Sequence, residues 1–217
     1  MYFPSDEYRS IVTIPFKFSA VRIFGRNMNP TELTAKLACT PAKSDERTPK
    51  KIEEASQEGM QRLTFWWDTI MDNVVIIDVQ NEVIDNIVSS IENNVMFCPG
   101  LPSDHLIVEL LHSKISAITK GFFDIHSISL RSEDTNGIET MFRNIDGYNL
   151  PGIEYFPSQA LHLVPWWERD TIEVCEFVKD AVVEDELYNH FSDFFGSSKE
   201  EADIIIFRSD DEDGQVQ

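Results

Sequence analysis

The first apolar stretch of the chain alternates in part between hydrophobic and polar positions, which is typical of a β-strand. Residues 10–16 and 17–24 are rich in isoleucine, valine, threonine and phenylalanine, and they end at Gly25. They predict one long or bent strand, or two short ones. Pro15 cannot donate a backbone hydrogen bond, so we expect it to mark a β-bulge or a sheet edge.

A helical pattern follows Gly25. Asn29 is a suitable helix cap, Pro30 suits the first helical turn, and Leu33 and Leu37 lie on one helical face. We therefore expect a helix of about two turns. Residues 40–57 are polar and charged and include Pro41 and Pro49, which predicts a long loop or a partly helical segment.

The middle of the chain contains three further apolar segments. Residues 63–67 and 74–79 have the composition of strands. Residues 79–94 place their apolar side chains at helical spacing and predict a helix. These side chains are Val83, Ile84, Ile87, Val88 and Ile91.

Two more strands are predicted at residues 106–111 and 123–130, and a short helix at 113–120 joins them. The order of elements is then strand, helix, strands, helix, strand, helix and strand. This order predicts an α+β domain over residues 1–131, in which helices pack on one face of a mainly antiparallel sheet.

The pattern weakens after residue 131, where turn signals such as Asp146-Gly147 follow one another. We expect residues 132–208 to form a less regular α/β extension that packs on the first domain. Within it, residues 184–195 have a helical apolar face and residues 204–207 predict a last strand. Residues 209–217 are polar and acidic, which predicts a disordered tail.

The segment AVRIFGRNMNPTELTAKL at residues 20–37, with TPAKS at residues 40–44, resembles the start of DUF4279-type domains of bacteria. The resemblance covers residues 17–131. It implies a strand, a glycine, a short helix and a proline-containing loop before a strand with a tryptophan, for which Trp66 or Trp67 is suited. It implies a fold and a bacterial or phage origin, and it carries no catalytic residue over to this chain.

The charge of the chain is high and unevenly placed. The sequence has 18 basic and 38 acidic residues, so its formal net charge is −20. Residues 1–51 carry +4 and residues 52–217 carry −24. Such a chain repels nucleic-acid phosphates and anionic membranes and attracts basic proteins. We therefore expect a basic protein partner, no direct nucleic-acid binding and no membrane binding, unless the acidity serves solubility alone.

The compartment is predicted from the start of the chain, its apolar runs and its cysteines. The first residues lack a basic region followed by an apolar stretch, so we expect no signal peptide. The apolar runs are far shorter than the roughly 20 residues that cross a bilayer. Cys39, Cys98 and Cys175 are odd in number and widely spaced, which argues against a disulfide framework. These features predict a cytoplasmic protein.

The sequence lacks the common motifs of nucleotide, zinc-protease and serine-hydrolase chemistry. We therefore expect no cofactor, no metal and no catalytic residue. Asp104-His105 and Asp124-x-His126 do place a carboxylate near an imidazole. In a strand, Asp124 and His126 share a face, as a metal site or an oriented general base requires.

Two tryptophan pairs, Trp66-Trp67 and Trp166-Trp167, complete the set of unusual features. If each pair lies in a strand, one indole of each pair faces solvent, and an exposed indole beside acidic residues suits a protein interface. The alternative is that the indoles cover the edge of the core.

Together these features favour a non-enzymatic interaction protein, of immunity or inhibitor type, that binds and neutralises a basic toxin or nucleic-acid-binding protein. Two alternatives remain, a small metal-dependent hydrolase that uses Asp124 and His126, and a structural component of a larger assembly. The expected partner-binding residues are Trp166, Trp167, Asp180, Glu184, Asp185 and Glu186.

Overall fold

The computed structural model describes residues 11–42, 49–90, 94–143, 165–171 and 174. These residues contain a six-stranded sheet with the order β4-β3-β1-β2-β5-β6. β2 is antiparallel to β1 and β5, and β6 is antiparallel to β5, whereas β3 and β4 run parallel to β1. The strands are β1 (Val12–Phe24), β2 (Asn27–Pro41), β3 (Val74–Asp78), β4 (Val95–Cys98), β5 (Phe123–Ser132) and β6 (Glu139–Arg143).

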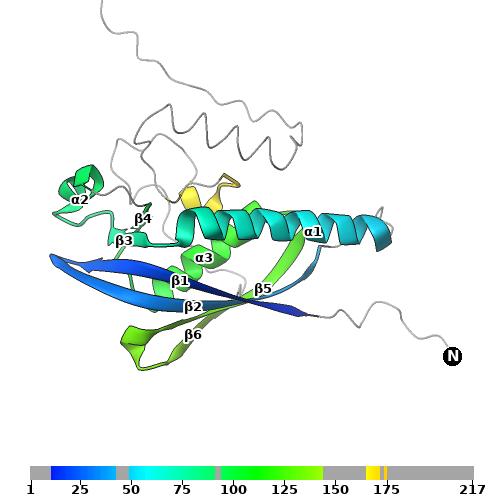
Figure 1. Cartoon of the computed structure of the whole chain (residues 1–217), viewed down its shortest axis with the longest axis horizontal. Coiled ribbons are helices and arrows are strands. Elements are labelled where there is room, and N and C mark those ends of the chain that lie inside the picture. The colour runs from blue at the N-terminus through cyan, green and yellow to red at the C-terminus, as the bar shows by residue number, and fades with distance from the viewer. Residues whose placement is uncertain (1–10, 43–48, 91–93, 144–164, 172–173, 175–217) are drawn as a thin grey trace, which may run out of the picture.

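Two helices, α1 (Pro49–Trp66) and α3 (Asp104–Ile118), cover one face of the sheet (Figure 1). Their buried side chains join Phe18, Leu33 and Ile76 in the main core. The shorter α2 (Ile84–Ser90) packs on the other face, where Ile87 joins a second cluster with Val75 and other side chains of β1, β3 and β4. The predicted α+β class is confirmed, and α2 departs from the expected one-sided helix layer.

The first two strands form one long hairpin. β1 is a single strand, which is one of the forms that the sequence predicted. The hairpin turn joins Phe24 to Asn27 and has Gly25 at a φ of 59°, where a residue with a Cβ is strained. β3 pairs with β1 from Ala20 onward, so among the described strands none pairs with this side of β1 beside Pro15. The predicted edge position of Pro15 is confirmed.

The helix predicted around Asn29 is wrong, because this segment is β2. Its buried positions from Thr31 to Cys39 alternate strictly with more exposed ones, as in a strand with one covered face. Leu33 and Leu37 are four residues apart, and this spacing fits both a helix and a strand. The short helix that the family resemblance implied is therefore a strand in this chain.

Two predicted strands are also wrong. Residues 63–67 end α1 and enter a π-helical turn at Trp67–Met71; Trp66 at the end of α1 and Trp67 and Ile70 in the turn are buried. Residues 106–111 belong to α3, which Ser103 caps by accepting a hydrogen bond from the Leu106 amide. Residues 106–111 are buried at every position except the half-buried Leu106, so their helical period is masked.

The remaining predictions are confirmed in part. β3 and β5 lie where strands were expected, and α2 forms within the predicted helix at residues 79–94. α1 begins inside the segment that was expected to be a loop or partly helical. The sheet also continues past residue 131 through β6, which the sequence did not predict. The elements predicted at residues 184–195, 204–207 and 209–217 lie outside the described residues.

None of the helices in the described ranges combines the length and the hydropathy that crossing a membrane requires.

Candidate functional site

The second tryptophan pair covers the sheet edge that β4 forms. Trp166 and Trp167 lie in a short 3₁₀ turn (Trp166–Glu168), and both indoles are fully buried. Trp166 Nε1 donates to the Phe97 carbonyl at 2.9 Å, and the Phe97 amide donates to the Val174 carbonyl at 3.1 Å. The segment therefore covers the free side of β4, where an unpaired strand edge would otherwise be exposed.

This burial changes the role expected of the two indoles. In this helical turn the two rings meet edge to face at 5.6 Å between ring centres, whereas in a strand they would lie on opposite faces. Neither side chain offers surface to a partner, so the structure agrees with the alternative that they cover the core. Asp180, Glu184, Asp185 and Glu186, the acidic part of the predicted surface, lie outside the described residues.

A buried lysine holds the same segment to α3. Lys114 has no exposed surface, and its Nζ donates to the carbonyls of Trp166 and Arg169 at 3.0 and 3.1 Å. Its ammonium lies 5.9 Å from the centre of the Trp166 ring. A cation on carbonyls at the end of a helical turn is favourable, because these groups carry partial negative charge.

The first tryptophan pair is buried as well. Trp67 stacks on Phe16 at 4.4 Å and meets Phe18 edge to face at 5.2 Å. Its Nε1 donates to the Lys17 carbonyl at 3.4 Å, on the side of β1 that β3 leaves free. Both tryptophan pairs therefore protect strand edges in the part of the chain that the structure describes.

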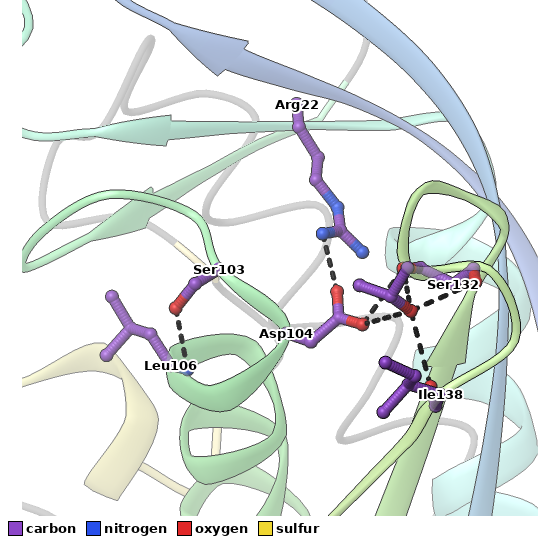
Figure 2. Close-up of polar contacts among 7 residues, drawn as sticks. Arg22, Ser103, Asp104, Leu106, Ser132 and Ile138 are labelled. Atoms are coloured by element: carbon purple, nitrogen blue, oxygen red, sulfur yellow. Dashed lines mark hydrogen bonds and ion pairs between the residues drawn. The ribbon is translucent and has the colours of Figure 1, made fainter.

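A charged network crosses the core between β1 and α3 (Figure 2). Arg22 Nη1 forms an ion pair with Asp104 Oδ1 at 2.5 Å, and both side chains are at least 95% buried. Asp104 Oδ2 accepts hydrogen bonds from Ser132 Oγ at 2.9 Å and from Thr135 Oγ1 at 3.3 Å. We call these four residues the Arg22 network.

The local sequence explains where the network forms. Arg22 continues the inward positions of Phe18 and Ala20, so its side chain must enter the core. Asp104 follows the cap Ser103 in the first turn of α3, where the helix dipole favours a negative charge. In the sequence, Asp104 stood out only as the neighbour of His105, and Arg22 was not predicted. One arginine at an inward position of an apolar strand was the available signal.

The Arg22 network leaves two polar groups without a hydrogen-bond partner. These are Arg22 Nε and Nη2, both buried. A third buried group without a partner is the hydroxyl of Thr31, which lies on the same face of β2 as the inward side chains. Each buried N–H or O–H without a partner costs roughly 1–3 kcal/mol.

Asp124 and His126 lie on the surface of β5, and their placement depends on a β-bulge. The register between β2 and β5 shifts between Ala38 and Cys39, opposite His126. Because of the bulge, Asp124 and His126 face outward, whereas Ile128, two residues after His126, faces inward. His126 Nε2 lies 3.1 Å from Thr40 Oγ1. The described residues contain no group of three potential metal ligands, here or elsewhere.

The other described histidines lie on α3. His105 Nε2 is 2.9 Å from Oε1 of the buried Glu109. His112 is buried beside the ring of Phe142, at 5.0 Å between ring centres, and burial lowers its pKa. Its neutral form is therefore favoured at neutral pH.

The described cysteines are buried thiols. Cys39 and Cys98 form no disulfide, and burial raises the pKa of Cys39 to about 11. Burial raises the pKa of Cys98 further, and Asp78 adds to this while Arg22 opposes it. A thiol needs a lowered pKa to act as a nucleophile at neutral pH, so neither cysteine is suited to that role.

No protein-family model matches the sequence, and no curated protein is similar to it.

Proposed function

We propose that this chain is a non-enzymatic, cytoplasmic interaction protein that binds a basic protein partner, such as a toxin or a nucleic-acid-binding protein that it inhibits. The observation that carries the proposal is where the charge lies. The residues that the structure describes have 12 basic and 17 acidic side chains, a net charge of −5. Residues 175–217 alone have 3 basic and 13 acidic side chains, a net charge of −10.

The sheet provides a fixed attachment point for the start of this acidic segment. Val174 is held by the Phe97 amide, and the acidic segment begins at the next residue. Trp166 and Lys114 fix the chain a few residues earlier. In this proposal the buried tryptophans hold the start of the segment, and acidic residues after Val174 meet the partner.

Charge separation of this kind favours rapid and selective association. A cluster of like charges steers an oppositely charged protein, and it suppresses binding of proteins with the same sign. The described part of the chain carries half the net charge of residues 175–217, so it contributes less to this field. No observation in the described residues favours a second function, since Asp124 and His126 are exposed and lack a third metal ligand there.

The test is capture of a partner by the full chain from a lysate of the source cells, at low and at high salt. We expect one basic protein to be retained at low salt and weakened at high salt, because surface electrostatics are screened. A test variant replaces four acidic residues after Val174 with lysine and should lose at least tenfold in affinity for that protein. The replaced residues are Asp180, Glu184, Asp185 and Glu186.

A matched variant makes the same change in net charge on the sheet domain. It replaces four exposed acidic residues with lysine, namely Glu53, Asp68, Asp72 and Glu133. This variant should retain most of the affinity. Equal loss in both variants would show that the total charge matters rather than the segment after Val174, and no basic protein at either salt would reject the proposal.

A further inference from the structure

We propose that β6 is the interface of a symmetric dimer, in which β6 of a second copy of this chain pairs with it antiparallel and joins the two sheets. β6 forms one rim of the sheet (Figure 1), and among the described strands only β5 pairs with it. A strand that is paired on one side presents a row of N–H and C=O groups on the other, to which a further strand can add. This surface is separate from the acidic segment after Val174.

Two other strand edges of the sheet are covered by tryptophans. The Trp166 indole contacts the backbone of β4, and the Trp67 indole contacts the backbone of β1 beyond its pairing with β3. β6 packs on β5 and on α3, and no described strand lies along its outer side. Its middle residues, Thr140, Met141 and Phe142, include no proline or charged side chain, and its register with β5 has no bulge. The common devices that block strand addition are therefore missing from the centre of β6.

The order of charges along β6 selects a second copy as the occupant. Glu139 and Arg143 lie two residues to either side of Met141. In an antiparallel pair of β6 strands centred on Met141, Glu139 of each copy therefore lies opposite Arg143 of the other. Directly opposite residues have Cβ atoms about 4.5–5.5 Å apart, and opposite charges at this distance are favourable. The two-fold axis forms this pair twice in each dimer.

Both charged groups have atoms available for this contact. Glu139 is 39% exposed and accepts hydrogen bonds from Ser129 and Lys36 on the same oxygen, Oε1. Within the described ranges, its Oε2 accepts no hydrogen bond, and the exposed Arg143 forms no ion pair. An arginine of a second copy can thus reach Oε2 without displacing Ser129 or Lys36.

The hydrophobic side chains of β6 fit the same register. Met141, which is 52% exposed, meets Met141 of the second copy at the two-fold axis on the open face of the sheet. On the other face, the half-buried Phe142 lies beside His112 of α3 and comes opposite Thr140 of the second copy. Strands of five residues bury less area than a standard interface, so we expect a weak dimer with a dissociation constant on the order of 10 µM to 1 mM.

The test is sedimentation of the full chain over a series of concentrations. We expect a monomer–dimer equilibrium that weakens at least about tenfold in Arg143→Glu and in Glu139→Lys, because each variant places like charges opposite each other. An equal mixture of the two variants should regain the dimer, since every carboxylate at these positions again faces a cation. Neither a change in net charge nor a folding defect of one variant would produce this recovery.

Arg26→Glu is the matched control, because it makes the same change in net charge as Arg143→Glu at an exposed arginine of the β1–β2 turn. Its dimer should weaken less than about twofold. Met141→Cys tests the register, since two cysteines at the two-fold axis are close enough to form a disulfide on mild oxidation. Met28→Cys, at an exposed position of β2, should be crosslinked no more than the unchanged chain.

Two results would overturn the proposal. The first is a chain that stays monomeric at every concentration, as expected if another segment or another protein covers β6. The second is a mixture of Arg143→Glu and Glu139→Lys that does not regain the dimer.

Discussion

The two halves of the sheet bury their strands in different ways. In the parallel half, β3 and β4 are buried at every position except Asp78, because α2 covers one face and the main helix layer covers the other. In the antiparallel half, β2 alternates between buried and more exposed positions from Thr31 to Cys39, β5 alternates in part, and β6 alternates between half-buried and exposed positions. The parallel half thus supplies rigidity and the attachment of the C-terminal segment, while the antiparallel half keeps one polar face.

The largest expected effect is a difference in stability between two truncations, one in each half, of side chains on the same face of the sheet. Ile77 of β3 is fully buried under α2, whereas Met141 of β6 is 52% exposed. Ile77→Ala should lower the free energy of unfolding by about 2–5 kcal/mol, because it leaves a cavity. Met141→Ala should change it by less than about 0.5 kcal/mol.

Urea unfolding of both variants checks this prediction. Similar losses of stability in the two would show that a further covering lies over the antiparallel half, and the contrast between the halves would then be wrong.

The next effect tests how the C-terminal segment is attached to the parallel half. Lys114→Met keeps most of the buried volume but removes the donors to the Trp166 and Arg169 carbonyls. We expect a loss of about 1.5–3 kcal/mol, as for hydrogen bonds to a charged group. Amide hydrogen exchange should also quicken at Phe97, whose N–H donates to Val174.

The Ser129 and Lys36 amides, on strands away from this attachment, provide the internal reference. Unchanged exchange at Phe97 would mean that Lys114 does not hold the segment.

A smaller effect concerns the helix layer over the antiparallel half. Gly59 lets α1 approach the start of β5, since a Cβ at this position would lie 2.6 Å from Phe122 Cβ and 2.7 Å from Phe123 Cε2. Gly59→Ala should therefore cost about 1–3 kcal/mol through overpacking, despite the better helix propensity of alanine. Gly100→Ala is the control, because its Cβ would lie at an ordinary 3.7 Å from Leu106. Thermal unfolding that ranks the two variants in the opposite order would contradict this account of α1.

The contrast between the halves also explains how far the sequence predicted the fold. β3 was predicted because its continuous apolar run is typical of a strand buried on both faces. β2 was missed because the spacing of Leu33 and Leu37 fits both a helix and a strand. Its pairing with β1 in a hairpin would have decided between them, but no local pattern reveals that pairing. β4 has four residues, too few to establish a period.

The candidate sites were less predictable than the fold. The burial of Trp166 results from contacts with Phe97 and Lys114, which lie 69 and 52 residues away in the sequence. Arg22 likewise meets Asp104 only after the sheet and α3 have formed. Charge, by contrast, is additive along the chain, so the acidic segment was apparent from composition alone.

The smallest expected effect lies on the polar face of the antiparallel half. Glu139 accepts a hydrogen bond from Ser129 at 2.5 Å and pairs with Lys36 at 3.1 Å. The Ser129 hydrogen bond, followed by Lys36, lowers the pKa of Glu139 below its ordinary value of 4.5. The stabilisation that these two contacts give to the folded state is therefore complete above about pH 4.5, and it is lost as the pH falls through the lowered pKa of Glu139.

Because Glu139 is partly exposed, Glu139→Gln should lower the free energy of unfolding by at most about 0.5 kcal/mol at pH 7 and by less at pH 3.5. Urea unfolding at both pH values checks this, with the exposed Glu53→Gln as control; an equal effect of the two variants would show that the Ser129 and Lys36 contacts add no stability.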